Sequence, residues 1–140
     1  MIPEIPLDMD QIKGFLAADE AGALYRYALQ ASAAGPVLEI GSYCGKSAIY
    51  LGLACQANDS TLFALDHHRG SEEHQRGEMF HDPALYDSGA GVMDSFREFR
   101  RNIRAAGLEQ TVVPIVAGSA AAARHWQTPN EGLHPLETFR

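Results

Sequence analysis

Two separated stretches of this chain carry residues that together could hold a nucleoside. Residues 37–47 read VLEIGSYCGKS, in which an apolar run meets a glycine turn and helix-forming residues follow. This pattern predicts a strand, a tight turn and a helix N-terminus with unpaired N–H groups. Asp66 ends the next apolar run, residues 61–65. A glycine turn followed by a carboxylate at the end of the next strand is how an α/β sheet holds the ribose of a nucleoside cofactor.

Spacing separates the candidate cofactors. A P-loop requires G-x-x-x-x-G-K-[ST], but Ile40 occupies the first glycine position, and a loop beginning at Gly41 is one residue too short. A dinucleotide fingerprint requires G-x-G-x-x-G, and here Tyr43 stands where the pyrophosphate would approach. The sequence therefore argues against an ATPase and against NAD or FAD. It favours S-adenosylmethionine, which has no phosphate and needs only a tight turn and a carboxylate.

The same residues resemble a known family. Residues 39–47, EIGSYCGKS, look like the first motif of the class I S-adenosylmethionine-dependent methyltransferases. They are most similar to the catechol-O-methyltransferase-like branch, whose loop also carries a Tyr-Cys-Gly run. Residues 66–74, DHHRGSEEH, resemble a stretch in bacterial relatives of that branch, and residues 116–120, VAGSA, resemble the family's loop after strand three. The resemblance implies methyl transfer, with O-methylation of a small-molecule acceptor as the expected reaction.

The resemblance also implies which residues bind the cofactor: Glu39, Gly41, Tyr43, Ser47, Asp66, His67, Gly118 and Ser119. The first three would line the methionine end of S-adenosylmethionine, and Ser47 would lie near its carboxylate. Asp66 would accept hydrogen bonds from the ribose hydroxyls, and the last three residues would meet the adenine. From the residues alone, Gly41 also suits an ordinary strand-to-helix turn, and Asp66 suits a helix or turn cap.

The elements that must position these residues follow from hydrophobic periodicity and capping residues. Strands are predicted at about 37–40, 61–66 and 111–117, and helices at about 11–17, 20–34, 46–57, 93–106 and 119–126. Asp19 is the expected N-cap of the second helix, and Ser119 is the expected N-cap of the last. Pro114 indicates that the third strand lies at a sheet edge or contains a bulge, because proline has no N–H to donate. The predicted fold is an α/β Rossmann-like three-layer sandwich with a parallel sheet.

Composition and charge indicate what kind of protein this is and which partners it would bind. The chain has 140 residues, 46% of them hydrophobic and 21% charged, which is typical of one globular domain. The formal net charge of −7 argues against nucleic-acid binding. We expect a cytoplasmic protein without a membrane partner, since no apolar run is long enough to span a bilayer and the N-terminus lacks a targeting pattern. Two cysteines indicate neither a disulfide framework nor a zinc site.

A long polar segment between Asp66 and Gly91 has no clear period, and a loop of this length is usually functional or mobile. It holds the residues that could bind a metal or transfer a proton: His67, His68, Glu72, Glu73, His74, His81 and Asp82. His74 and Glu78 would share a face if that part were helical. A solvated histidine-rich loop is the more common explanation. We therefore predict no metal ligands, although this segment could still bind a divalent metal ion. The sequence does not identify the catalytic residues.

The pattern changes after Trp126, because residues 127–140 contain two prolines and no strand-like alternation. We therefore divide the chain into a partial S-adenosylmethionine-binding domain, residues 1–126, and an irregular tail, residues 127–140. The family would continue with further strands, so the sheet is expected to be truncated after strand three. A second chain, an exchanged element or the C-terminal tail could cover the open edge of strand one, and we expect a homo-oligomer through this edge. The alternatives are an inactive fragment or oligomerisation module that keeps a nucleoside pocket, and a different nucleoside-binding enzyme.

Overall fold

The computed structural model describes residues 1–71, 74, 77, 78 and 81–126. In this part of the chain, a three-stranded parallel sheet has the order β1 (Val37–Ile40), β2 (Leu62–Asp66), β5 (Val112–Val116). Leu62 of β2 lies beside Val37 on one side and Val112 on the other. The predicted α/β fold with a parallel sheet is confirmed. Pro114 lies in β5, an edge strand of the described sheet. On the outer side of β5 no described strand needs a backbone N–H, so a proline is tolerated there.

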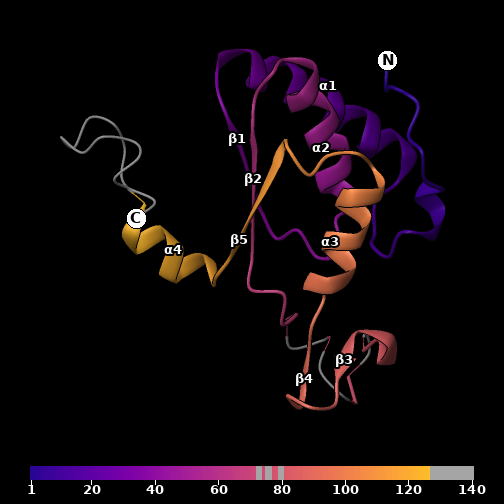
Figure 1. Ribbon diagram of the computed structural model, residues 1–140, viewed down its shortest axis with the longest axis vertical. Coiled ribbons are helices and arrows are strands. Elements are labelled where there is room, and N and C mark those ends of the chain that lie inside the picture. Colours follow the sequence, from indigo (N-terminus) through magenta and orange to yellow (C-terminus); the bar gives the residue numbers. More distant parts are fainter. Residues whose placement is uncertain (72–73, 75–76, 79–80, 127–140) are drawn as a thin grey trace.

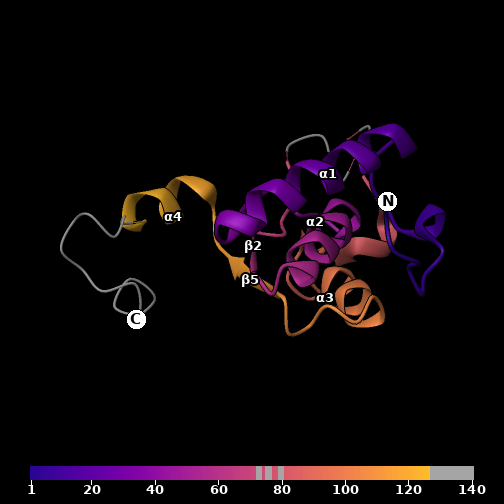
Figure 2. The ribbon, with the colours of Figure 1, turned by 90° about the horizontal axis from the view of Figure 1, so that it is seen from above.

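Helices lie on both sides of this sheet. α1 (Ala18–Ala34), α2 (Lys46–Ala57) and α3 (Phe96–Ala105) cover one side, and α4 (Ser119–His125) lies on the other (Figures 1 and 2). The three-layer arrangement is therefore present, and its third layer is thin. Among the described residues, no helix has the length and apolar composition that a bilayer crossing requires.

The two faces of the sheet differ in how well they are covered. On the face toward α2 and α3, Leu62 and Val112 are buried in the main core, together with Phe99 of α3. α2 is central to this core, and this agrees with its apolar residues on nearly every side. On the opposite face, Leu38 is 41% exposed and Ile40 is 65% exposed. The main core therefore holds β1 and β2 by packing on one face of the sheet, the face toward α2 and α3.

The N-terminal part differs from the sequence prediction in two places. α1 begins at Ala18, and Glu20 Oε2 accepts a hydrogen bond from the N–H of its N-cap residue, Ala17, at 2.9 Å. Asp19 is therefore not the cap but lies in the first turn, where its charge favours the helix dipole. Residues 11–17 form no α-helix, and the preceding helical turn is a 3₁₀ segment, η1 (Met9–Gln11). Lys13–Leu16 therefore lies outside any helix or strand, and Gly14 lies close to Lys46 at the start of α2.

The polar segment after β2 contains short elements that the sequence did not reveal. They are η3 (Pro83–Leu85), β3 (Tyr86–Asp87) and β4 (Val92–Met93), and β3 pairs with β4 in antiparallel fashion. α3 therefore begins at Phe96, three residues later than predicted. We call residues 69–94 the excursion, because the residues that flank it bond to each other: the Ser95 N–H donates to the His68 carbonyl at 3.0 Å. The predicted candidates Glu72 and Glu73, and the tail 127–140, lie outside the described residues.

Candidate cofactor site

The glycine loop, residues 41–45, joins β1 to α2. Its backbone enters the left-handed region at Gly41 (φ 89°), Tyr43 (φ 47°) and Gly45 (φ 94°). A Cβ at Gly45 would also lie 3.2 Å from the Phe99 ring, so the close approach of α3 adds to the need for glycine there. The Cys44 carbonyl accepts a hydrogen bond from Asn102 Nδ2 at 2.8 Å. The loop is thus fixed in a strained form, and strain of this kind is concentrated at functional sites.

Asp66 ties this loop to the end of β2. Its Oδ2 accepts from the N–H groups of Ser42 (2.9 Å) and Tyr43 (2.8 Å), and its Oδ1 accepts from the N–H of His68 (2.9 Å). Burial raises the pKa of Asp66, but the N–H donors of His68, Tyr43 and Ser42 outweigh it and hold the pKa below 3.8. Two loop N–H groups that could cradle a phosphate therefore bind a carboxylate. This supports the exclusion of a phosphate-binding loop.

A second carboxylate, Glu39, lies at the end of β1. Ser47 Oγ donates to its Oε2 at 2.6 Å. Its Oε1 is buried and has no hydrogen-bond partner among the described residues. Burial raises the pKa of Glu39, and the hydrogen bond from the Ser47 hydroxyl partly offsets this rise. Because an unpaired buried carboxylate oxygen is costly, this atom suits a donor or cation supplied by a ligand.

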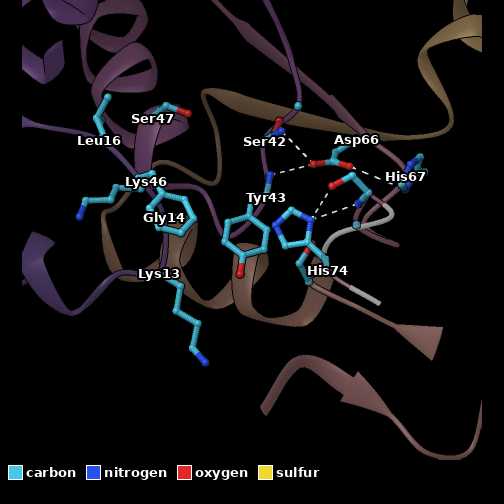
Figure 3. Close-up of a pocket in the computed structure, with 15 residues that line it drawn as sticks. Lys13, Gly14, Leu16, Ser42, Tyr43, Lys46, Ser47, Asp66, His67 and His74 are labelled. Atoms are coloured by element: carbon cyan, nitrogen blue, oxygen red, sulfur yellow. Dashed lines mark hydrogen bonds and ion pairs between the residues drawn. The ribbon is translucent and has the colours of Figure 1, made fainter. Parts of the chain in front are cut away.

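A cavity of about 460 Å³ lies over the carboxyl ends of β1 and β2. It has the size of an ordinary small-molecule site. From the predicted set it is lined by Gly41, Tyr43, Ser47, Asp66 and His67. The remaining lining comes from the N-terminal segment (Lys13, Gly14, Phe15, Leu16), the loop and α2 (Ser42, Lys46), the excursion (Gly70, Ser71, His74) and Ser95. In Figure 3 the Tyr43 phenol lies beside the His74 imidazole, with ring centroids 5.6 Å apart.

Three predicted residues are not in this lining. Glu39 is linked to the cavity through Ser47, which lines it. Gly118 is the N-cap of α4 and Ser119 begins that helix, so Gly118 and not Ser119 is the cap. Both follow Ala117, whose N–H donates to the carbonyl of Asp66 at 3.2 Å. Gly118 and Ser119 therefore lie near the carboxyl end of β2. Their contact with the adenine stays a prediction.

The sequence analysis missed the N-terminal segment, Lys13–Leu16, which lines one side of the cavity. Lys13 Nζ donates to Asp82 Oδ2, so this segment is linked to the excursion. Gly14 was the available signal, because a glycine inside a supposed helix of seven residues weakens that prediction. Here Gly14 has a φ of 146°, which is outside the helical region.

The histidine candidates do not gather as a metal site. In the described part of the chain, no group of three or more His, Cys, Asp or Glu side chains could hold a metal ion. His68 is buried against the Phe96 and Phe99 rings, and its Nδ1 is 2.8 Å from Ser95 Oγ. Burial is the main cause that lowers the pKa of His68, against the raising effect of Asp66. His68 therefore joins the two ends of the excursion as a neutral imidazole.

Comparison with known proteins assigns this site to a family. The model of a methyltransferase domain family matches residues 38–135 of the chain. The chain belongs to this methyltransferase domain family. The match begins in β1, covers the glycine loop and Asp66, and extends beyond β5. The predicted class I S-adenosylmethionine-dependent methyltransferase family is confirmed, and the catechol-O-methyltransferase-like branch stays a prediction.

A solved structure shares the fold of the methyltransferase domain. It is the crystal structure of a presumed O-methyltransferase from Klebsiella pneumoniae, with a TM-score of 0.58 and 19% sequence identity. The alignment covers 92% of this chain and 51% of the Klebsiella protein. The chain therefore spans about half the length of this structural relative.

Proposed function

We propose that this methyltransferase domain binds S-adenosylmethionine in the 460 Å³ cavity and serves O-methylation of a small molecule. The observation that carries the proposal is the composition of the cavity lining. Gly41, Tyr43 and Ser47 come from one stretch of the sequence, Asp66 and His67 come from another, and all five meet in one lining. They meet outside the carboxyl ends of parallel strands, where open α/β sheets bind their ligands.

Two carboxylates have acceptor positions that fit the proposed cofactor. Glu39 Oε1, buried and without a partner among the described residues, suits the ammonium group of the methionine end. Asp66 Oδ1 accepts one N–H, and a carboxylate oxygen has two lone pairs, so one ribose hydroxyl could bind there. Asp66 Oδ2 already accepts two N–H groups and has no lone pair to spare. When bound, S-adenosylmethionine supplies a methyl group on a positively charged sulfur.

The test is a calorimetric titration of S-adenosylhomocysteine into the 140-residue chain, with its mass in solution recorded alongside. We expect saturable one-to-one binding. A folded sample that does not bind would contradict the proposal and favour an inactive fragment or assembly module. The mass measurement tests the predicted homo-oligomer, which would form at the outer edge of β1. In the described residues this edge has no partner strand.

The raised pKa of Glu39 adds a pH dependence to the proposal. A bound ammonium group favours the ionised carboxylate, so binding should release a proton while free Glu39 is still partly protonated. The affinity should therefore increase with pH as the pH passes through the Glu39 pKa, which lies above 4.5. Glu39→Gln should weaken binding roughly tenfold and remove this pH dependence. Exposed Glu109→Gln is the control and should change neither.

A further inference from the structure

A second cavity, of about 300 Å³, adjoins the proposed cofactor cavity. It is lined by Lys13, Gly14, Phe15, Tyr43, His74, His81, Asp82 and Pro83. The first five of these residues also line the larger cavity, so they form the boundary between the two. A molecule in the smaller cavity would therefore lie next to one in the larger cavity. Methyl transfer requires this proximity, because acceptor and donor must be aligned within contact distance.

Hydrogen bonds determine which histidine at these cavities can accept a proton. The Ser71 N–H donates to His74 Nδ1 at 3.1 Å, and the Arg69 N–H donates to His67 Nδ1 at 2.8 Å. In both neutral rings Nδ1 is therefore the acceptor and Nε2 carries the hydrogen. His81 has the opposite arrangement, because its Nδ1 is 3.1 Å from the His74 carbonyl oxygen, which can only accept.

His81 Nδ1 must therefore carry the hydrogen, and the lone pair of the neutral ring is on Nε2. The ring is further oriented by an edge contact with the Tyr86 ring, with centroids 5.8 Å apart. Among the described histidines that line either cavity, His81 has the tautomer with a basic Nε2. A donated Nδ1–H and a basic Nε2 form the usual arrangement of a general base.

The rest of the lining suits a small planar molecule. Phe15, at the boundary of both cavities, is 84% exposed, and its ring can cover a flat ligand. Burial is the main cause that raises the pKa of Tyr43 to about 12, so its phenol stays protonated and can donate a hydrogen bond. Lys13 and Asp82 pair with each other at the same cavity and balance each other's charge. The site therefore has apolar rings, a neutral donor and one basic nitrogen.

We propose that this smaller cavity is the acceptor subsite and that His81 Nε2 removes the proton from the acceptor hydroxyl. The inference rests on the proposed function, because it assumes a methyl donor in the larger cavity. The acceptor O–H bond breaks and its proton goes to Nε2; the oxygen bonds to the methyl carbon as the carbon–sulfur bond breaks, and a neutral thioether leaves. The imidazolium then returns the proton to water.

The base also determines the class of acceptor. An imidazole is too weak a base to remove a proton readily from an aliphatic alcohol, whereas the hydroxyl of a phenol is much more acidic. Proton transfer is efficient when the strengths of the acid and the base are matched. We therefore assign the subsite to a small planar molecule with an acidic hydroxyl, a phenol or an enol.

The probe for the test is 4-nitrophenol, whose phenolate absorbs visible light. It is titrated into the chain saturated with S-adenosylhomocysteine, and the apparent pKa of the bound probe is measured from its absorbance. In the wild-type chain we expect saturable binding and a fall of about one unit, because the imidazolium stabilises the phenolate. His81→Asn keeps a donor near the Nδ1 position but has no Nε2, and should abolish the fall. His125→Asn, in α4, should leave it unchanged.

Each outcome supports or overturns the proposal. Absence of saturable 4-nitrophenol binding would overturn the subsite, and a fall that survives His81→Asn would overturn the base. If His81→Asn fails to fold, the wild-type chain is treated with diethyl pyrocarbonate, and 4-nitrophenol should slow modification of His81. Unslowed modification would overturn the proposal. Failure of S-adenosylhomocysteine binding, with the 4-nitrophenol effects intact, would instead overturn the proposed function and with it the acceptor role, and would leave only a phenol-binding cavity beside His81.

Discussion

The glycine loop (residues 41–45) and the excursion (residues 69–94) both line the proposed cofactor cavity, but they are held in different ways. The loop is held through its backbone, by Asp66 and Asn102. In the described residues, the two ends of the excursion are joined by two contacts between His68 and Ser95. Leu85 and Met93 of the excursion also pack on Cys44 of the loop.

This difference separates the two proposed tasks. The cofactor is the same in every turnover, and a loop fixed by buried hydrogen bonds can be complementary to it in advance. The acceptor cavity is built from side chains of the excursion and of the N-terminal segment, which are joined by the partly exposed Lys13–Asp82 pair. We infer that the cofactor side is the stiff part of the site and the acceptor side the adaptable part. Three predictions test this contrast.

Asp66→Ala should have the largest effect, because it removes the acceptor of three N–H groups. We expect a loss of roughly 3 kcal/mol in the free energy of unfolding, measured in urea, and no detectable S-adenosylhomocysteine binding. Since the pKa of Asp66 is lower in the folded state, its contribution is present above about pH 4 and is lost as pH falls through the folded pKa. The gap between wild type and variant should therefore shrink in acid.

Asp19→Ala, in the first turn of α1, is the control for this variant and should cost well under 1 kcal/mol. An Asp66→Ala protein of wild-type stability that still binds S-adenosylhomocysteine would show that the glycine loop is not held by this carboxylate.

Gly41→Val should have the next largest effect. No atom lies within 4 Å of the added Cβ, so the cost comes from the backbone, whose φ of 89° disfavours a branched side chain. We expect a loss of about 2 kcal/mol in stability and at least tenfold weaker S-adenosylhomocysteine binding. Gly35→Val is the matched control, because Gly35 also has open space but an extended φ of 164°. Equal losses in both variants would disprove the role of loop conformation.

The Lys13–Asp82 pair should have the smallest effect. About a third of each side chain is exposed, at 33% and 30%, so water screens the attraction. A double-mutant cycle with Lys13→Met and Asp82→Asn should give a coupling energy of about 0.5 kcal/mol that decreases with added salt. A salt-independent coupling several times larger would mean that the excursion is held as firmly as the glycine loop.

The same contrast explains what could be predicted from the sequence. α2 was predicted at its observed bounds, since Gly45 and the apolar residues after it act locally. The glycine loop and the position of Asp66 were also predicted, but not that Asp66 bonds to Ser42 and Tyr43, because this pairing depends on how β1 and β2 align.

The excursion was the least predictable part. β3 and β4 contribute two residues each, too few to produce an alternating pattern, and Met93 therefore looked like the start of α3. The tautomer of His81 depends on a carbonyl seven residues earlier in the chain, which no local pattern could indicate. The N-terminal segment was missed because its role depends on contact with residues far along the chain.

The joined ends of the excursion have a consequence for how such domains diverge. Because His68 and Ser95 bond to each other, the residues between them form a closed loop between β2 and α3. Closure entropy rises slowly with loop length, by roughly 0.6 kcal/mol for each doubling. Insertions, deletions and exchanges within 69–94 should therefore be tolerated by the sheet. Natural selection could change the substrate range of this domain through one segment while the glycine loop and its carboxylates stay constant.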